Sequence, residues 1–328
     1  MGNLPLVSIV MPTLNAEKYL SEAVKSIQVQ TYKNWELNII DDTENNQRTV
    51  EIINSFGDSR IRYFIGPKKK SIAASLNFGI NISNGDFIAR MDADDISFKN
   101  RLEIQFEYLN KKKLDICGSS IRLFGNDFRI NAYPENPEEI KYAALLTSPL
   151  AHPTVFGKRE IFKKFPYSEN YLVEDYELWL RMLKSYVIIG NVPKVLLKYR
   201  IHNNSSTAFI SDEVIHERAK ISKEYFIQFQ DLFNFEALEI LDFGFRKNYS
   251  LTEVEQIVLE LEVFYKKKYI SGGFFVKMIS VYFRKIADGS LLNVFRYLKI
   301  LYKNDLQISL LELMMVIFKN IHSKKSKV

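Results

Sequence analysis

Three carboxylates stand within four residues in the segment Met91 to Asp95 (MDADD), at the end of an apolar run. Negative charges this close together repel one another unless protons or a cation compensate them. A hard divalent ion such as Mg²⁺ or Mn²⁺ would use one or two of these carboxylates and complete its shell with water and substrate phosphates. The alternative is an exposed acidic turn in which Asp95 caps the following segment. On the first interpretation, Asp92 and Asp94 hold an ion that neutralises a leaving phosphate oxygen.

The chain lacks the two glycine-rich motifs that commonly bind phosphate groups. Neither G-x-G-x-x-G nor G-x-x-x-x-G-K-[ST] occurs in the sequence. A metal ion on Asp92 and Asp94 would supply the positive charge that such motifs provide elsewhere. This combination favours a nucleotide diphosphate as the substrate.

A second acidic pair, Glu174-Asp175, opens a segment with helical periodicity. A carboxylate beside a substrate hydroxyl can act as its general base. Alternatively, both acids only stabilise the positive start of the helix, by about 0.3–1 kcal/mol each. In the same segment, Trp179 falls on the apolar stripe and is predicted to lie in the core, whereas Arg181 is predicted to be a surface charge.

Two of the four histidines, His152 and His202, lie in the segments AHP and YRIHNNSS. A lone histidine is more often structural or exposed than functional, so both interpretations stay open for each of them.

The segments that must position these residues alternate between strand and helix patterns, which predicts an α/β doubly wound sheet with a parallel core. Continuous apolar runs predict buried strands; they cover residues 6–11, 35–40, 61–65, 87–91 and 115–119. Apolar residues at helical spacing predict helices at residues 17–30, 49–56, 71–83, 99–111 and 174–184. Asn15 and Ser71 are the predicted caps of the first and third helices.

Polar clusters follow three of the predicted strands. They are Thr13 with Asn15, then Asp41 with Asp42, and then Asp92 to Asp95. Because ligands of open α/β sheets bind at the carboxyl ends of the strands, we expect all three clusters at one edge.

Composition bounds the class of protein. The chain has 328 residues with 47% hydrophobic content, enough for one sizeable core. Its one cysteine, Cys117, lies in an apolar stretch and is predicted to pack in the core. The formal charge of +6 hides an asymmetry, because residues 266–328 carry +10 and residues 1–265 carry −4. A nucleic-acid-binding function of the whole chain therefore loses its main support.

The basic C-terminal tail alternates aromatic and aliphatic residues with lysines and arginines from Phe274 onward. Its longest apolar run, Leu306 to Phe318, is too short to cross a bilayer of about 30 Å. Basic amphipathic helices lie on anionic membrane surfaces. The alternative, a helical subdomain packed on the catalytic part, is equally open.

In their order and spacing, several segments resemble the family 2 glycosyltransferases of the GT-A fold, over about residues 5–207. They read VSIVMPTLNAEKYLSEAVKSIQVQTY, ELNIIDD, SIAASLNFGI, NGDFIARMDADD, AHPTVF, EDYELWLRM and YRIHNNSS. The resemblance implies a Rossmann-like, mostly parallel sheet with flanking helices in a catalytic domain at residues 1–210. Residues 1–95 would be its nucleotide-sugar half and residues 96–210 its acceptor half. A basic helical region would follow at residues 211–328.

The resemblance also implies an activity. The chain would move a sugar with inversion from a nucleotide diphosphate donor, with UDP favoured, to a glycan or lipid diphosphate-linked acceptor. The metal would be Mn²⁺ or Mg²⁺. The setting would be bacterial surface polysaccharide synthesis, such as O-antigen or capsule, on the cytoplasmic, inner face of the cell membrane, with no nucleic-acid partner.

Laid over this sequence, the family pattern gives each candidate residue a role. Pro12, Thr13 and Asn15 would line the nucleoside pocket, one acid of Asp41-Asp42 would meet the base, and Asn77 would belong to the donor site. Asp92 would lie near the ribose or the metal, Asp94 would be the metal ligand with His202 beside it, and Arg90 and Asp95 would shape the sugar side. Asp175, with Glu174, would take the acceptor proton, and His152 would border the acceptor. Relatives commonly continue the second-strand acids with Gly-Ser, whereas this chain has Thr43-Glu44-Asn45.

Two rival functions can be weighed on the sequence. A sugar nucleotidyltransferase also uses a Rossmann-like sheet and acidic metal ligands, but it normally has a glycine-rich loop after the first strand, and MPTLN has no glycine. A catalytically silent, sugar-binding or scaffolding relative at the membrane is opposed by the presence of both MDADD and the Glu174-Asp175 pair.

Overall fold

A computed structural model gives the fold of the chain. It describes residues 4–67, 71–125, 127–145, 147–202, 211–227, 249–283 and 291–304, together with Ile286, Leu306 and Val316. The chain forms two compact units. The first, here the N-terminal unit, comprises Met1–Ile140 and Ser148–Ile221, and the second, the C-terminal unit, comprises Lys141–Thr147 and Ser222–Val328.

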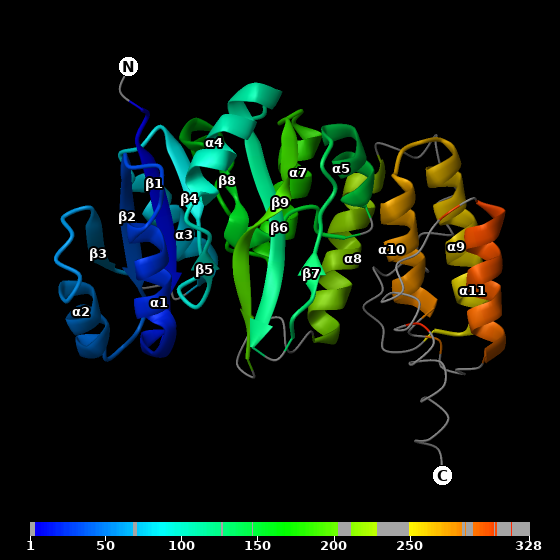
Figure 1. The fold of residues 1–328 in the computed structure, drawn as a ribbon, viewed down its shortest axis with the longest axis horizontal. Helices are drawn as coiled ribbons and strands as arrows, with labels where there is room; N and C mark the ends of the chain where they lie inside the picture. The colour runs from blue at the N-terminus through cyan, green and yellow to red at the C-terminus, as the bar shows by residue number, and fades with distance from the viewer. Residues whose placement is uncertain are drawn as a thin grey trace, which may run out of the picture. The chain divides into compact units, whose positions relative to one another are not determined.

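The N-terminal unit is built on one twisted sheet with helices packed against it, so the predicted α/β class is confirmed (Figure 1). The strand order is β3-β2-β1-β4-β8-β6-β9-β5, and β7 pairs with β6. The strands are β1 (Val7–Thr13), β2 (Trp35–Asp41), β3 (Ile61–Ile65), β4 (Phe87–Arg90), β5 (Ile96–Ser97), β6 (Ile116–Gly125), β7 (Ile130–Asn131), β8 (Phe156–Lys158) and β9 (Ile189–Ile201).

The half of the sheet that contains β1 to β4 is entirely parallel. Every residue of β2 is buried, and residues 7–11 of β1 are buried on both faces, as the continuous apolar runs predict. The other half is mixed, because β8 runs antiparallel to both of its neighbours, whereas β6 and β9 are parallel. The 13-residue strand β9 and the short strand β8 escaped the sequence analysis.

The helices of this unit include each of the predicted ones. They are α1 (Glu17–Gln28), α2 (Gln47–Asn54), α3 (Ile72–Asn81), α4 (Arg101–Lys112), α5 (Pro137–Ala143), α6 (Arg159–Lys164), α7 (Glu174–Lys184) and α8 (Asp212–Phe226), with one 3-10 turn at His152–Thr154. The last residues of α5 and of α8 belong to the C-terminal unit. The predicted apolar stripe of α1 faces the core, since Leu20, Ala23, Val24 and Ile27 are all buried.

One predicted cap is confirmed and the other is wrong. Ser71 accepts a hydrogen bond from the amide of Ala74 and caps α3. Asn15 does not cap α1, because the cap position is Ala16 and carries no side-chain bond. Instead, Asn15 has a left-handed φ of 51° and donates its amide to Thr43 Oγ1 at 2.9 Å. That backbone conformation turns the residue toward the loop after β2 rather than toward the helix.

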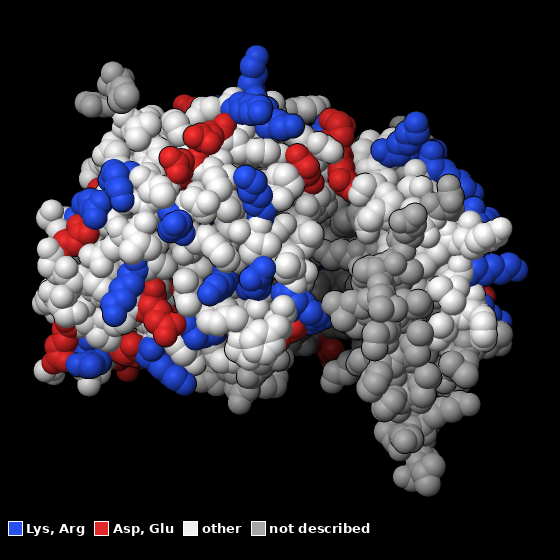
Figure 2. Space-filling view, in the orientation of Figure 1, with Lys and Arg blue, Asp and Glu red and all other residues white. Residues whose placement is uncertain are grey.

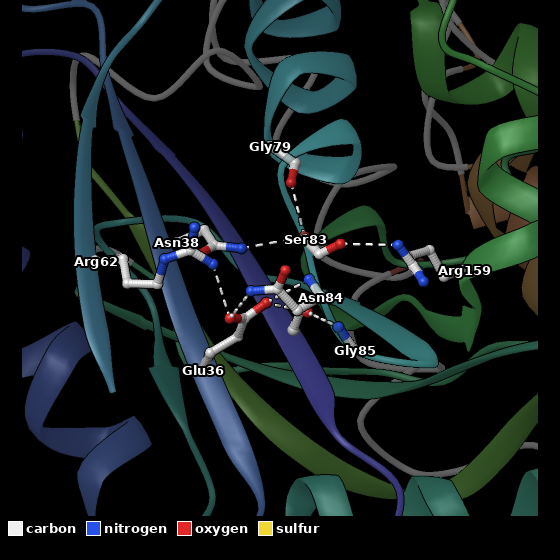
Figure 3. A network of polar contacts seen from close by, with 9 residues as sticks. Glu36, Asn38, Arg62, Gly79, Ser83, Asn84, Gly85 and Arg159 are labelled. Carbon is white, nitrogen blue, oxygen red and sulfur yellow. Dashed lines mark hydrogen bonds and ion pairs between the residues drawn. The ribbon is translucent and has the colours of Figure 1, made fainter. Parts of the chain in front are cut away.

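A buried polar network ties the sheet together at the amino ends of β1 and β2 (Figure 3). Glu36 accepts from Ser8 Oγ at 2.6 Å, from the amide of Asn84 at 2.7 Å and from Arg62 at 2.8 Å. Burial alone would raise the pKa of Glu36, but these bonds hold that pKa below its usual value. The network therefore joins β1, β2, β3 and the turn before β4 through one ionised carboxylate.

We expect Glu36→Ala to lower the free energy of unfolding by about 3 kcal/mol, because it removes one member of a buried, hydrogen-bonded ion pair. Glu51→Ala is the matched control, since Glu51 is exposed and bonds to Arg48 and Gln47 on the same helix. Its loss should stay below about 0.5 kcal/mol. Urea unfolding followed by circular dichroism measures both. Equal losses would show that the network does not stabilise the sheet.

The C-terminal unit contains the helices α9 (Leu251–Lys266), α10 (Gly272–Phe283) and α11 (Leu291–Lys303). They bury an aromatic core of their own that includes Phe275, Tyr282 and Tyr297. Ser280 Oγ lies 2.6 Å from the hydroxyl of Tyr297, and Lys303 pairs with Glu262 at 3.1 Å. The described helices thus pack on one another as a subdomain.

Among the residues that the structure describes, no helix has both the length and the apolar character to cross a membrane. The predicted apolar run at residues 306–318 lies outside the described residues except at Leu306 and Val316.

Candidate active site

The acidic turn Asp92 to Asp95 follows β4 directly and brings three carboxylates together. One ligand oxygen from each of Asp92, Asp94 and Asp95 lies within 4.8 Å of the others. Burial, followed by repulsion from Asp92 and Asp94, raises the pKa of Asp95 well above its usual value, and burial also raises that of Asp92. Among the described side chains, Asp95 Oδ2 is a buried oxygen that has no partner. This donor set fits a divalent cation with oxygen ligands.

Three cationic side chains surround this turn. The Arg90 guanidinium pairs with Asp92, and Arg101 lies behind it and donates to the Arg90 carbonyl at 2.6 Å. Arg200, at the end of β9, donates its amide to Asp95 Oδ1 at 2.9 Å. Asp95 therefore does not cap the following segment, and the interpretation of MDADD as a simple exposed turn fails. Neither Arg101 nor Arg200 was a predicted site residue.

His202 lies beside the turn, as the family pattern implies. Its Nε2 atom is 3.0 Å from Asp94 Oδ2, and its ring packs on Tyr19 of α1 with centroids 5.3 Å apart. An imidazole at this position can orient the Asp94 carboxylate or join it as a metal ligand.

The residues predicted to meet the nucleoside gather at the neighbouring ends of β1 and β2. Pro12 and Thr13 pair in register with Ile40 and Asp41. Asp41 is buried and accepts from the Thr43 amide at 2.9 Å and from the Tyr63 hydroxyl at 3.1 Å. Its carboxylate thus shapes the turn that follows β2.

Asp42 is less buried than Asp41 and accepts from Ser75 Oγ of α3. A methyl group added at Gly66 would come within 1.8 Å of Asp42 Oδ1, so a side chain at Gly66 would displace Asp42. Thr43, whose hydroxyl oxygen accepts a hydrogen bond from the Asn15 amide, was not predicted as a site residue from the sequence. Its only signal was the Asp41-x-Thr43 spacing, typical of a turn in which the aspartate accepts from the amide two residues later.

The acidic pair Glu174-Asp175 lies at the start of α7, near the acidic turn. Burial, followed by repulsion from Asp175, raises the pKa of Glu174 to about 7. The charge of Arg90 lowers the pKa of Glu174, and that of Asp92 raises it. The two acidic clusters are therefore close enough to form one site. Asp175 is half-buried, and its Oδ1 accepts from the Tyr176 amide at 2.7 Å.

A buried histidine and tyrosine lie between the two clusters. His152 Nε2 is 2.9 Å from the Tyr167 hydroxyl, and His152 Nδ1 is 4.0 Å from Glu174 Oε1. Burial and the nearby Arg90 hold the pKa of His152 well below its usual value, so the ring is neutral at pH 7. Burial also raises the pKa of Tyr167, which therefore keeps its proton.

Asn77 exchanges two hydrogen bonds with the main chain of Tyr167. Its Nδ2 donates to the Tyr167 carbonyl at 2.8 Å, and its Oδ1 accepts from the Tyr167 amide at 2.9 Å. The side chain thus fixes the loop that carries Tyr167. Tyr167 itself stands in PYSEN, which gave no motif signal in the sequence.

Three structural predictions near the site are confirmed. Trp179 is buried and packs edge-on against His152, with centroids 5.9 Å apart. Arg181 is partly exposed and pairs with Glu177 one turn earlier on α7. Cys117 is fully buried in the core.

Comparison with known proteins matches the N-terminal unit to one family. The sequence model described as "Glycosyl transferase family 2" matches residues 8–169. The uncharacterized glycosyltransferase MJ1057 of Methanocaldococcus jannaschii is 36% identical over 62% of this chain and 73% of its own. The O-antigen biosynthesis glycosyltransferase WbnJ of Escherichia coli is 32% identical over 71% of this chain and 93% of its own.

A third relative has a more specific name. WfgD of Escherichia coli, described as a UDP-Glc:alpha-D-GlcNAc-diphosphoundecaprenol beta-1,3-glucosyltransferase, is 32% identical over 61% of this chain and 79% of its own.

Two solved structures share the GT-A fold. Residues 1–349 of TarS from S. aureus, in complex with UDP-GlcNAc, align with a TM-score of 0.54 over 98% of this chain and 92% of that one, at 14% identity. The mannosyltransferase PcManGT from Pyrobaculum calidifontis, in complex with GDP-Man and Mn²⁺, aligns with a TM-score of 0.56 over 100% and 89%, at 12% identity.

Proposed function

Because the chain belongs to glycosyl transferase family 2, we propose that it transfers a sugar with inversion from a UDP-sugar to a glycan or lipid diphosphate-linked acceptor. The observation that carries this proposal is the meeting of two acidic clusters, one that follows the parallel strand β4 and suits a cation, and one that opens α7 and suits a base. The relative WfgD is named for a UDP-Glc donor and a diphosphoundecaprenol acceptor, which supports the choice of substrates.

The donor would lie along the ends of β1, β2 and β4, within the half at residues 1–95. Its nucleoside would pack against Pro12, Thr13 and Asn15, next to the turn that begins with Asp41 and Asp42. Asp92 and Asp94, with His202 close by, would hold Mn²⁺ or Mg²⁺. Such an ion supplies Lewis-acid stabilisation to the departing diphosphate.

The acceptor would lie on the side of α7, within the half at residues 96–210. Asp175 would take the proton of the acceptor hydroxyl as that oxygen bonds to the anomeric carbon and the bond to the diphosphate oxygen breaks on the opposite face. Arg90, beside Asp92 and close to Glu174, would hold the sugar between the two clusters. His152 would donate or accept at the acceptor side as a neutral ring.

A donor screen tests this function directly. UDP-sugars and other nucleotide sugars are added with Mn²⁺ or Mg²⁺, and the shift in melting temperature and the release of nucleoside diphosphate are measured, since ligand binding stabilises the folded state by mass action. A metal-dependent shift together with hydrolysis supports a transferase. A shift without any turnover toward donor or acceptor would point instead to a silent sugar-binding relative.

We further propose that the C-terminal unit rests on the inner face of an anionic membrane, where a lipid-linked acceptor would be found. Large apolar side chains are exposed on two of its helices, with Leu259 and Val263 on α9 and Phe295 and Tyr302 on α11. Figure 2 shows Lys and Arg along the outer edge of this unit. Aromatic residues beside basic ones are typical of helices that lie in a membrane interface.

The double variant Phe295→Ser/Tyr302→Ser is expected to lower binding to phosphatidylglycerol vesicles by at least tenfold, because each exposed aromatic ring contributes more than about 1 kcal/mol when it enters the interface. Vesicle flotation measures the bound fraction. Tyr186→Ser is the matched control, since Tyr186 is 90% exposed but belongs to the N-terminal unit. Unchanged flotation of the double variant would contradict membrane attachment through α11.

A further inference from the structure

The last residues of β9 reach back to the acidic turn from more than a hundred residues away in the sequence. Arg200 lies in β9, and His202 directly follows its last residue, Ile201. Arg200 holds the main chain of the turn, and His202 lies 3.0 Å from the Asp94 carboxylate. Asp94 is therefore contacted at two points by residues at the end of one segment.

Arg200 makes contacts through both its side chain and its main-chain amide. Its Nε donates to the Asp94 carbonyl at 2.7 Å, while its main-chain amide donates to Asp95 Oδ1 at 2.9 Å. The guanidinium carbon lies 4.3 Å from the ring centre of Tyr19 and 4.4 Å from that of Phe124. Its Nη2 pairs with Glu22 on α1. The acidic turn, α1 and β6 thus meet at one guanidinium.

These contacts differ in what they can contribute. The Glu22 side chain is 58% exposed, so its ion pair with Arg200 is screened by solvent and contributes little. The Arg200 side chain is only 14% exposed, and its bond to the Asp94 carbonyl is made beside two aromatic rings. A planar guanidinium can stack on a ring and donate in its own plane at the same time, which a lysine ammonium cannot do.

Tyr19 completes the arrangement. Its ring packs against both the Arg200 guanidinium and the His202 imidazole. Tyr19 therefore links the two side chains that contact Asp94.

We propose that Arg200 is a positioning residue, which sets the Asp94 carboxylate for the cation and, through it, for the donor. The proposal rests on the proposed function, because it assigns Arg200 a part in the same metal site. Residues that orient metal ligands in this way commonly change metal affinity about 10- to 100-fold when they are replaced.

The test measures Mn²⁺ binding to the donor-free, full-length protein from the electron paramagnetic resonance signal of free Mn²⁺. We expect Arg200→Gln to weaken Mn²⁺ binding by about 10- to 100-fold and Arg200→Lys to weaken it less, since lysine can still donate to the Asp94 carbonyl. Glu22→Gln and Arg122→Gln are the controls. The first removes only the exposed ion pair, and the second removes one positive charge from an exposed position on β6. Both should change binding less than about twofold.

Kinetics at saturating and limiting Mn²⁺ give a second readout. A positioning role predicts that Arg200→Gln raises the Mn²⁺ concentration needed for half activity and the donor KM more than it lowers kcat at saturation. A residue that only stabilised the fold would lower the melting temperature without shifting the Mn²⁺ requirement of the folded fraction.

Each outcome decides between the proposals. If the wild type binds Mn²⁺ and folded Arg200→Gln binds it equally well, the positioning role is overturned and the metal site stands. Should Arg200→Gln fail to fold, Arg200→Lys with wild-type Mn²⁺ affinity would overturn the positioning role in its place. If the wild type binds no Mn²⁺ or Mg²⁺, the proposed metal site is itself overturned, and the role of Arg200 with it.

Discussion

Asp94→Asn is expected to reduce sugar transfer about a thousandfold, equivalent to about 4 kcal/mol of transition-state stabilisation. Asn keeps the shape of the side chain and can still bond His202, but it removes one negative charge from the three carboxylates that lie within 4.8 Å of one another. The loss should come from weaker metal binding, so donor affinity in Mn²⁺ should fall as well. Isothermal titration with UDP in the presence and absence of Mn²⁺ measures this loss separately from turnover.

The control for this variant is Asp58→Asn. Asp58 pairs with Arg60 at 2.7 Å in the turn before β3 and has no contact with the acidic turn. Its replacement removes the same charge and should leave both transfer and UDP binding unchanged. Unaltered titration curves for Asp94→Asn would remove Asp94 from the metal site.

Asp175→Asn is expected to lower kcat about 10²- to 10⁴-fold, the usual contribution of a general base, while UDP binding in Mn²⁺ stays unchanged. The split is expected because Asp175 lies in the first turn of α7, whereas the residues proposed to bind the donor follow β1, β2 and β4. Stopped turnover with wild-type UDP titration would support the assignment. Substantial turnover by this variant would move the base to Glu174.

The variant Glu174→Gln distinguishes the roles of Glu174 and Asp175 through the pH dependence of the rate. Burial raises the pKa of Glu174 to about 7, so in the wild type this group loses its proton between pH 6 and 8 and adds a negative charge beside Asp175. That charge, next to the proposed base, should favour removal of the acceptor proton, so the rate should rise over this range, and the rise should disappear in Glu174→Gln. A rate profile that keeps its rise near pH 7 in this variant would assign the titration to another group.

The titration of Glu174 should also affect stability, which should fall as pH rises, whereas the rate should increase. The folded state holds the Glu174 proton up to about pH 7, whereas the unfolded chain releases it near pH 4.5, so this carboxyl makes the protein less stable as pH rises through that window. Glu174→Gln should therefore flatten the fall in melting temperature between pH 5 and pH 8.

The sequence predicts the parallel half of the sheet well, for a physical reason. Strands buried on both faces need continuous apolar runs, and their parallel arrangement brings the residues after each strand to one edge. The Asp41-Asp42 pair and the acidic turn at residues 92–95 therefore come together as predicted, with Thr13 beside them. The family pattern adds the acids of α7 and His202, which the structure also brings close.

The residues that the sequence missed depend on pairings between distant segments. Arg200 reads as one more surface charge until the register of β9 with β6 places it beside Phe124. Tyr167 lies in a loop without periodicity, and its position depends on Asn77, ninety residues earlier. Asn15 was wrongly predicted as a cap because asparagine is a common cap residue, whereas its left-handed backbone conformation cannot be deduced from residue type alone.

The bonds from Arg200 and His202 to the acidic turn have a consequence for synthesis on the ribosome. Residues 1–140 can pair β1 to β4 as they emerge, but Asp94 and Asp95 gain these partners only after β9 has been translated. In a nascent chain that ends before β9, Asp94 and Asp95 would lack these hydrogen bonds. If Asp94 holds the ion as proposed, the nascent protein is expected to acquire its affinity for divalent ions only after β9 has formed.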